Sequence, residues 1–225
     1  MLRIASIMLI AVMMSTCAIS GTFAKYVTTG TGSDNARVAK WGVTVTPNGE
    51  LFLRNYTKTD GTYTVSDNTV ESSDTWKLVA PGTSHGLTEV QLTGTPEVAV
   101  RITYDAVVNL DGWVLSDGTT EYCPVYFTIE GKTYGTDDSG LGFDYTYTTV
   151  EELKTAIVNA VKACGKDYAP NTDLSGISAD APTITWTWAF ETGHDVEDTD
   201  LGNKAAAGNY AVIQLTVTTT VTQID

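Results

Sequence analysis

The sequence predicts a mainly β fold, an antiparallel β-sandwich with one inserted α-helix. After residue 35 the chain is rich in Thr, Val, Tyr and Trp, and turn dipeptides such as Asn48-Gly49 and Pro81-Gly82 interrupt it often. Three segments alternate apolar and polar residues with a period of two, so each offers one apolar face. Two such apolar faces are shielded from water when they pack on each other, which predicts a sandwich.

The N-terminus is predicted to be a secretory signal peptide covering residues 1–24. Residues 4–19 are almost all apolar or small, and Arg3 supplies the only charge before Lys25. We place the cleavage after Ala24, with a cut after Ser20 as the alternative. The apolar run is shorter than the roughly 20 residues that span a bilayer, so we expect no stable membrane anchor after processing.

Two regions follow the signal peptide. Residues 25–35 are mainly Thr, Gly, Ser and Asp, which predicts a flexible leader. Residues 36–225 are long enough for one substantial core and are predicted to form the β-sandwich domain. We find no internal repeat.

The clearest strands are residues 97–109, 183–190 and 211–222. In the second of these, alternation predicts that the rings of Trp186, Trp188 and Phe190 all point into the core, so core packing is favoured over sugar stacking. Weaker strands are predicted at 38–46, 51–55, 62–66, 76–79, 88–93, 126–129 and 132–134.

One helix is predicted at about residues 149–164. Thr149 and Glu152 have the spacing of a capping box, and Gly165 can end the helix. The apolar positions follow helical spacing and form one stripe. They are Val150, Leu153, Ile157, Val161 and Cys164.

The charge balance excludes nucleic acid as a partner. The chain has 27 acidic against 13 basic residues, a net charge of −14, so phosphate would repel it.

No catalytic site is apparent, and we expect no enzyme activity. His85 and His194 do not have the spacing of a zinc site, and neither a nucleophile elbow nor a phosphate-binding loop is present. The acidic run at residues 194–200 is the best candidate ion site, ahead of Asp137 and Asp138, because its carboxylates could present hard oxygens to Ca²⁺. Its candidate ligands are Asp195, Glu197, Asp198 and Asp200.

The cysteines leave two alternatives open. Cys17 lies in the signal segment, where the preceding residues do not favour lipidation. Cys123 and Cys164 could form a disulfide in an oxidising compartment, or remain two unlinked core thiols, and we favour the second.

The junction at residues 21–26 (GTFAKY) resembles the signal-peptide end of the TasA/camelysin family of Gram-positive bacteria, and residues 36–43 (ARVAKWGV) resemble its first mature strand. Looser similarities extend over the chain, including the Ala-rich run at 205–208 and the Thr/Val-rich terminal strand. The resemblance implies cleavage by a SipW-type signal peptidase, a jelly-roll-like sandwich, and assembly into extracellular biofilm-matrix fibres. It also implies that the freed leader pairs as a donor strand with the next subunit, starting with Lys25, Tyr26, Val27, Thr28 and Thr29.

The leading hypothesis is therefore a secreted fibre subunit that self-associates or joins related subunits by strand addition. The alternative is a monomeric envelope module that binds carbohydrate or Ca²⁺. Exposed rings at Trp113 or Tyr122 would favour the alternative.

Overall fold

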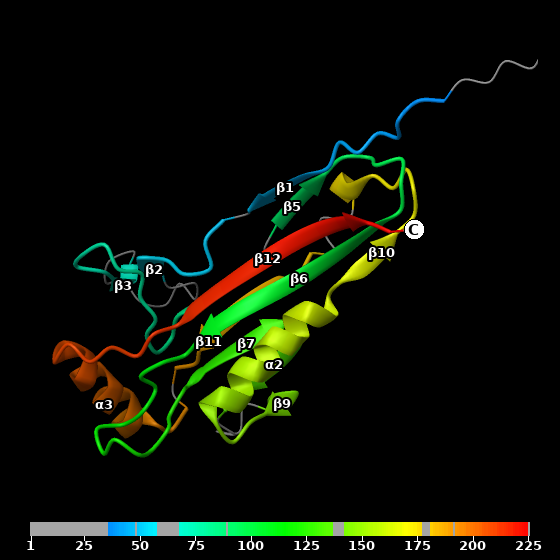
Figure 1. Ribbon diagram of the computed structural model, residues 1–225. Helices are drawn as coiled ribbons and strands as arrows, with labels where there is room; N and C mark the ends of the chain where they lie inside the picture. The colour runs from blue at the N-terminus through cyan, green and yellow to red at the C-terminus, as the bar shows by residue number, and fades with distance from the viewer. Residues whose placement is uncertain are drawn as a thin grey trace, which may run out of the picture. The chain divides into compact units, whose positions relative to one another are not determined.

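The computed structural model describes residues 36–47, 49–57, 68–88, 90–136, 142–176, 181–190 and 192–224 (Figure 1). The chain divides into two compact units, Met1–Val38 and Ala39–Asp225, and every described helix and strand belongs to the second. The predicted signal peptide, residues 1–24, and the predicted leader, residues 25–35, lie outside the described residues.

The larger sheet of the second unit has five strands in the order β4-β11-β7-β8-β9. Its neighbours pair antiparallel except β8 and β9, which run parallel. The strands are β4 (Ser84–Thr88), β7 (Val125–Ile129), β8 (Lys132–Gly135), β9 (Tyr145–Thr146) and β11 (Thr183–Trp188).

A second sheet has the order β10-β6-β12 and is wholly antiparallel. Two further antiparallel pairs, β1-β5 and β2-β3, complete the described strands. The strands of these three groups are β1 (Thr44–Pro47), β2 (Asn55–Thr57), β3 (Asn68–Glu71), β5 (Val90–Thr93), β6 (Val100–Asn109), β10 (Lys166–Tyr168) and β12 (Gln214–Gln223).

The inward faces of these sheets join in one hydrophobic core. Burial alternates along β6, β7 and β11 as the period of two predicts, with Ile102, Phe127 and Trp186 among the fully buried side chains. The Trp186 indole N–H donates to the Leu51 carbonyl at 2.8 Å, so its one polar group is satisfied. The predicted class, an antiparallel β-sandwich with an inserted helix, is confirmed; the jelly-roll topology stays a prediction.

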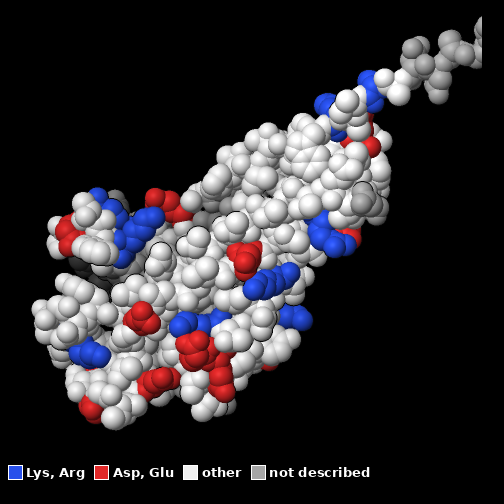
Figure 2. Space-filling view, in the orientation of Figure 1, with Lys and Arg blue, Asp and Glu red and all other residues white. Residues whose placement is uncertain are grey.

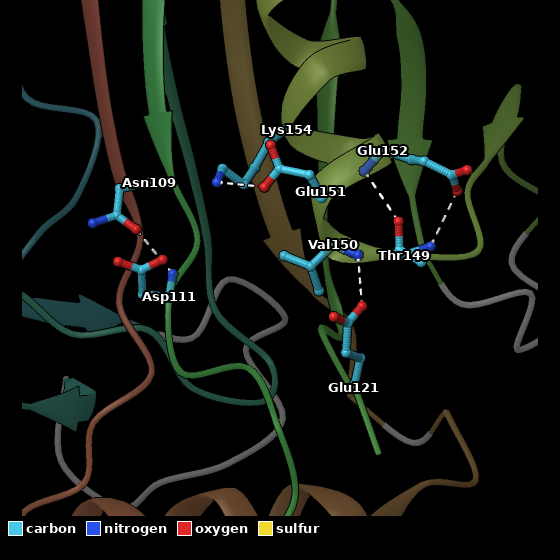
Figure 3. A network of polar contacts seen from close by, with 8 residues as sticks. All are labelled: Asn109, Asp111, Glu121, Thr149, Val150, Glu151, Glu152 and Lys154. Atoms are coloured by element: carbon cyan, nitrogen blue, oxygen red, sulfur yellow. Dashed lines mark hydrogen bonds and ion pairs between the residues drawn. The ribbon is translucent and has the colours of Figure 1, made fainter. Parts of the chain in front are cut away.

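Helix α2 (Val150–Ala163) confirms the helix predicted at 149–164. The Thr149 side chain accepts from the Glu152 N–H, and the Glu152 carboxylate accepts from the Thr149 N–H, which completes the predicted capping box (Figure 3). The helix packs against β6, β7 and β8 (Figure 1). Its buried residues are Val150, Leu153, Ile157 and Val161.

A second helix, α3 (Asp195–Ala206), contains the acidic run, where the sequence predicted no helix. Only Leu201 of this helix is buried, and no apolar stripe marks it in the sequence. Acidic residues in its first turn and Lys204 in its last turn favour the helix through its dipole.

Some strand boundaries also differ from those predicted. Strand β11 ends at Trp188, and the Phe190 side chain is 69% exposed, so the prediction that three aromatic rings enter the core holds for only two of them. The apolar-polar alternation continues in the sequence to Phe190, but the hydrogen-bonded pairing of β11 stops at Trp188. The predicted strand at 76–79 is not a strand, and the one at 62–66 lies outside the described residues.

Candidate functional site: the open edge of β12

Strand β12 is the last strand of its sheet among the described residues. It pairs antiparallel with β6 over its whole length, from Gln214 opposite Asn109 to Gln223 opposite Val100, with no shift in register. No described strand pairs with its other side. Ten residues of regular backbone therefore present hydrogen-bonding groups at an open edge.

This edge lacks the features by which natural sheets block further pairing. Charged side chains, prolines and bulges commonly protect edge strands, and the sequence of β12, QLTVTTTVTQ, contains neither a charge nor a proline. Figure 2 shows a mostly uncharged surface over β6 and β12, interrupted near its middle by neighbouring acidic and basic side chains. In a chain of net charge −14, an uncharged edge of this length is a distinct feature.

The inward side of β12 is only half covered. Leu215, Val217 and Val221 are partly buried, whereas the inward side chains of β6 beside them are buried. The difference follows from position, because a central strand has neighbours on both sides and an end strand has one. A strand added at this edge would cover these three side chains further.

Thr219 is a further feature of this strand that periodicity did not single out. It occupies an inward position, and its Oγ1 is buried with no hydrogen-bond partner among the described residues. A buried hydroxyl without a partner is unfavourable, so an added strand could also supply its missing partner.

The residues predicted to form the donor strand lie outside the described residues. They are Lys25, Tyr26, Val27, Thr28 and Thr29. The structure therefore supplies a candidate acceptor edge and leaves the donor as a prediction from sequence.

The predicted calcium ligands lie on α3 and direct their carboxylates to separate partners. Asp198 accepts a hydrogen bond from the Tyr122 hydroxyl at 2.7 Å, and Asp200 accepts from the Ser116 N–H and hydroxyl at 2.6 Å each. Glu197 lies 3.7 Å from the His194 ring nitrogen. Asp195 is exposed in the first turn.

Within the described parts of the chain, no group of three His, Cys, Asp or Glu side chains is placed to hold a metal ion. The acidic run therefore serves in the described structure to attach α3, and calcium binding there stays a prediction from sequence.

Burial gives Asp198 an unusual environment among these acids. Desolvation raises the pKa of its carboxyl, although the Tyr122 hydroxyl opposes this by stabilising the charged form. The Trp188 indole N–H also favours the charged form, but it does not reach hydrogen-bond geometry and remains buried without a partner. Hydrogen bonds from Ser116 instead lower the pKa of Asp200.

The rings that would have favoured a sugar-binding module are not exposed. Trp113 is 2% exposed and Tyr122 is 8% exposed, and the Trp113 indole N–H donates to the Val212 carbonyl at 3.0 Å. Both rings belong to the core, so they offer no platform for stacking.

The two cysteines of the domain are free thiols. Cys123 is buried and Cys164 is half-buried. This arrangement agrees with the favoured prediction of two unlinked core thiols. Burial raises the pKa of Cys123 to about 12 and that of Cys164 to about 11.

Among the residues that the structure describes, no helix combines the length and apolar character needed to cross a bilayer. Comparison of the chain with models of known protein families found no match, and neither curated proteins nor solved structures gave a significant match.

Proposed function

We propose that this chain is a secreted structural subunit of an extracellular or cell-surface fibre of the biofilm-matrix type. In this proposal, residues 25–35 of one copy pair as a strand with the open edge of β12 in the next copy. Its main support is β12, an uncharged ten-residue strand that pairs with a described strand on one side only. Strand addition of this kind needs no pocket and no catalytic group.

The predicted donor segment and the acceptor edge are similar in length. Residues 25–35 are about as long as β12, and they contain neither proline nor any residue unsuited to an extended conformation over 25–29. Backbone hydrogen bonds alone are largely offset by the entropy lost when a flexible segment is ordered. Burial of apolar side chains must therefore supply much of the net free energy.

Tyr26 and Val27 are the only large apolar residues in the predicted leader. On β12, the partly buried Leu215, Val217 and Val221 are the surfaces available to receive them. The proposal therefore assigns the specificity of assembly to contacts between these two sets of side chains.

The principal test compares secreted protein that begins at Lys25 with protein that begins at Ala36. We expect the longer form to produce filaments visible by negative-stain electron microscopy and the shorter form to remain dispersed. Both forms should give the same circular dichroism spectrum, because every core residue that the structure describes follows residue 36 and is present in both. Filaments from both forms, or from neither at any concentration, would contradict the proposal.

A second test addresses the acceptor edge. Thr220→Lys places a charge on the outward face of β12, and Thr103→Lys places the same charge on the outward face of the central strand β6, directly opposite in the register. We expect the β12 variant to slow filament growth more than the β6 variant at equal thermal stability. Equal growth rates would show that assembly does not use this edge.

N-terminal sequencing of the protein recovered from culture medium tests secretion and processing separately. The expected first residue is Lys25. Recovery of an uncleaved chain only from cells would contradict the proposed location.

A further inference from the structure

A hollow lies between α2 and the β8-β9 edge of the larger sheet. It is open to solvent and has a volume of about 520 Å³. Tyrosine rings form one wall, and one face of α2 forms the other. The lining residues are Tyr134, Tyr147, Glu151, Glu152, Thr155, Ala156, Asn159 and Ala160.

Three tyrosines gather beside this hollow because of the parallel β8-β9 register. Tyr134 lies opposite Tyr145, and their rings stack with centroids 4.9 Å apart at an interplanar angle of 21°. Tyr147 follows two residues later, so it projects from the same side of the chain. Desolvation raises the pKa of Tyr134 and of Tyr147, so both phenols are protonated at neutral pH and their rings keep an electron-rich face.

The hollow exists because small side chains face the tyrosines. Ala156 and Ala160 lie one turn apart on α2 and both line it. Longer apolar residues at these two positions would extend toward the rings and fill the space. Thr155 and Asn159 supply neutral polar groups on the same helix.

The two glutamates of the lining differ in how their charges are compensated. Glu151 forms an ion pair with Lys154 at 2.7 Å, whereas Glu152 accepts only backbone N–H groups, from Thr148 and Thr149. Figure 3 shows their carboxylates turned to opposite sides of the helix. Glu152 therefore brings to the hollow a negative charge with no ion pair to a described Lys or Arg.

An anionic ligand is disfavoured here although α2 begins nearby. The Val150 N–H donates to the Glu121 carboxylate at 3.0 Å, and the Glu152 N–H donates to the Thr149 hydroxyl at 3.2 Å (Figure 3). These first-turn donors are already occupied by side chains of the protein. The helix start therefore offers an incoming phosphate or carboxylate little, and Glu152 repels it.

The tyrosine cluster already accommodates one cation. Lys132 Nζ lies 5.8 Å from the centroid of the Tyr145 ring, at cation–π distance. Tyr134, Tyr147 and Glu152 all line the hollow, so it combines tyrosine side chains with a carboxylate.

We propose that this hollow binds an organic ammonium group, with Tyr147 and Tyr134 supplying ring faces and Glu152 supplying the opposite charge. The ammonium could belong to a lysine-type primary amine or to a quaternary amine of the choline type, which share the chemistry that the site recognises. This proposal is independent of the assembly proposal, because it involves neither β12 nor the leader.

The test is an NMR titration of isotope-labelled protein beginning at Ala36 with choline chloride. Butylammonium chloride is titrated in parallel, and the neutral isostere 3,3-dimethyl-1-butanol and sodium chloride serve as controls. We expect saturable shifts at Tyr147 and Asn159 with at least one of the two ammonium salts and none with the controls. A preference for butylammonium would indicate a primary amine as the natural ligand, and a preference for choline a quaternary one.

Two variants test whether the ammonium ion binds in this hollow, and a third tests whether loss of a negative charge elsewhere has the same effect. Glu152→Gln keeps a side chain that can complete the capping box while removing the charge, and Tyr147→Leu removes a ring. We expect each to weaken binding by about two- to fivefold, whereas Glu50→Gln, at a glutamate paired with Lys77 outside the hollow, should leave it unchanged.

The proposal is wrong if the neutral isostere shifts the same residues with the same midpoint, or if neither ammonium salt produces saturable shifts. It is also wrong if Glu152→Gln and Tyr147→Leu, both folded by circular dichroism, bind with the affinity of the unmodified protein.

Discussion

The two helices of this domain are attached to it by different physical means. Helix α2 buries four apolar side chains against three strands, whereas α3 buries only Leu201. Polar contacts supply most of the remaining attachment of α3, from Asp198 to Tyr122, from Asp200 to Ser116 and from Lys204 to the Val114 carbonyl.

This difference bears on how each helix responds to its surroundings. Apolar burial involves no charge that could be protonated or screened, so α2 should unfold only with the core. The charged hydrogen bonds that Asp200 accepts at a partly exposed surface are weakened by its protonation and by screening, so α3 should detach before the domain unfolds. Variants in the two helices should therefore differ in how strongly they affect the stability of the whole domain.

The largest effect is expected from Leu153→Ala in α2. Leu153 is fully buried, and removing its side chain should lower the free energy of unfolding of the whole domain by about 2–5 kcal/mol. Chemical denaturation measures this. Leu201→Ala is the matched variant in α3, and it should increase hydrogen exchange in α3 while moving the global midpoint much less. Equal global losses would show that both helices belong to one cooperative unit.

A smaller loss is expected from Thr149→Ala, which removes the N-cap of α2. The Glu152 N–H loses its acceptor, and caps of this type contribute about 0.5–2 kcal/mol. Thermal unfolding is a suitable measurement. Thr148→Ala, one residue before the cap and exposed, is the control and should be near neutral. A neutral result at Thr149 would mean that core packing alone fixes the start of α2.

A local effect is expected from Asp200→Ala in α3. The variant removes the acceptor for two donors of Ser116, so the amide protons of α3 should exchange faster while the sheets remain protected. Because hydrogen bonds lower the pKa of Asp200, its contribution is present above its ordinary pKa and is lost as the pH falls. Thr199→Ala, exposed on the same helix, is the control, and equal exchange in the two variants would contradict the prediction.

The smallest effect, with the opposite sign, is expected from Asp198→Asn. The raised pKa of Asp198 means that the folded state favours its protonated form, so its contribution is greatest at low pH and is lost as the pH rises through the raised value. Asn keeps an acceptor for the Tyr122 hydroxyl without the desolvated charge. At neutral pH the variant should therefore hold α3 at least as tightly, with a flatter pH dependence of α3 exchange. Faster exchange at neutral pH would show that the charge itself is required.

The difference between an apolar and a polar attachment also explains how much of the fold the sequence could predict. Strand β6 and helix α2 were predicted because their buried positions repeat with the period of their own secondary structure. Helix α3 has one buried residue, so it leaves no period to detect, and its acidic residues were considered only as a candidate ion site. Charge order along the segment, acids first and Lys204 last, was the signal that could have indicated a helix.

The candidate sites were predictable to different degrees. The composition of β12 was visible in sequence, but its place at the end of a sheet depends on which strands pair, and pairing between distant segments is not encoded locally. The tyrosine hollow depends on the parallel register of Tyr134 with Tyr145, which no sequence pattern indicated. The exposure of Phe190 likewise depends on where a ladder ends.

The two unlinked thiols have a consequence for how this domain can be produced. With pKa values of about 12 for Cys123 and about 11 for Cys164, almost no thiolate exists at neutral pH to attack a disulfide or an electrophile. Because both cysteines of the domain are free thiols, the fold does not depend on a disulfide, and the domain should keep the same covalent form in a reducing medium.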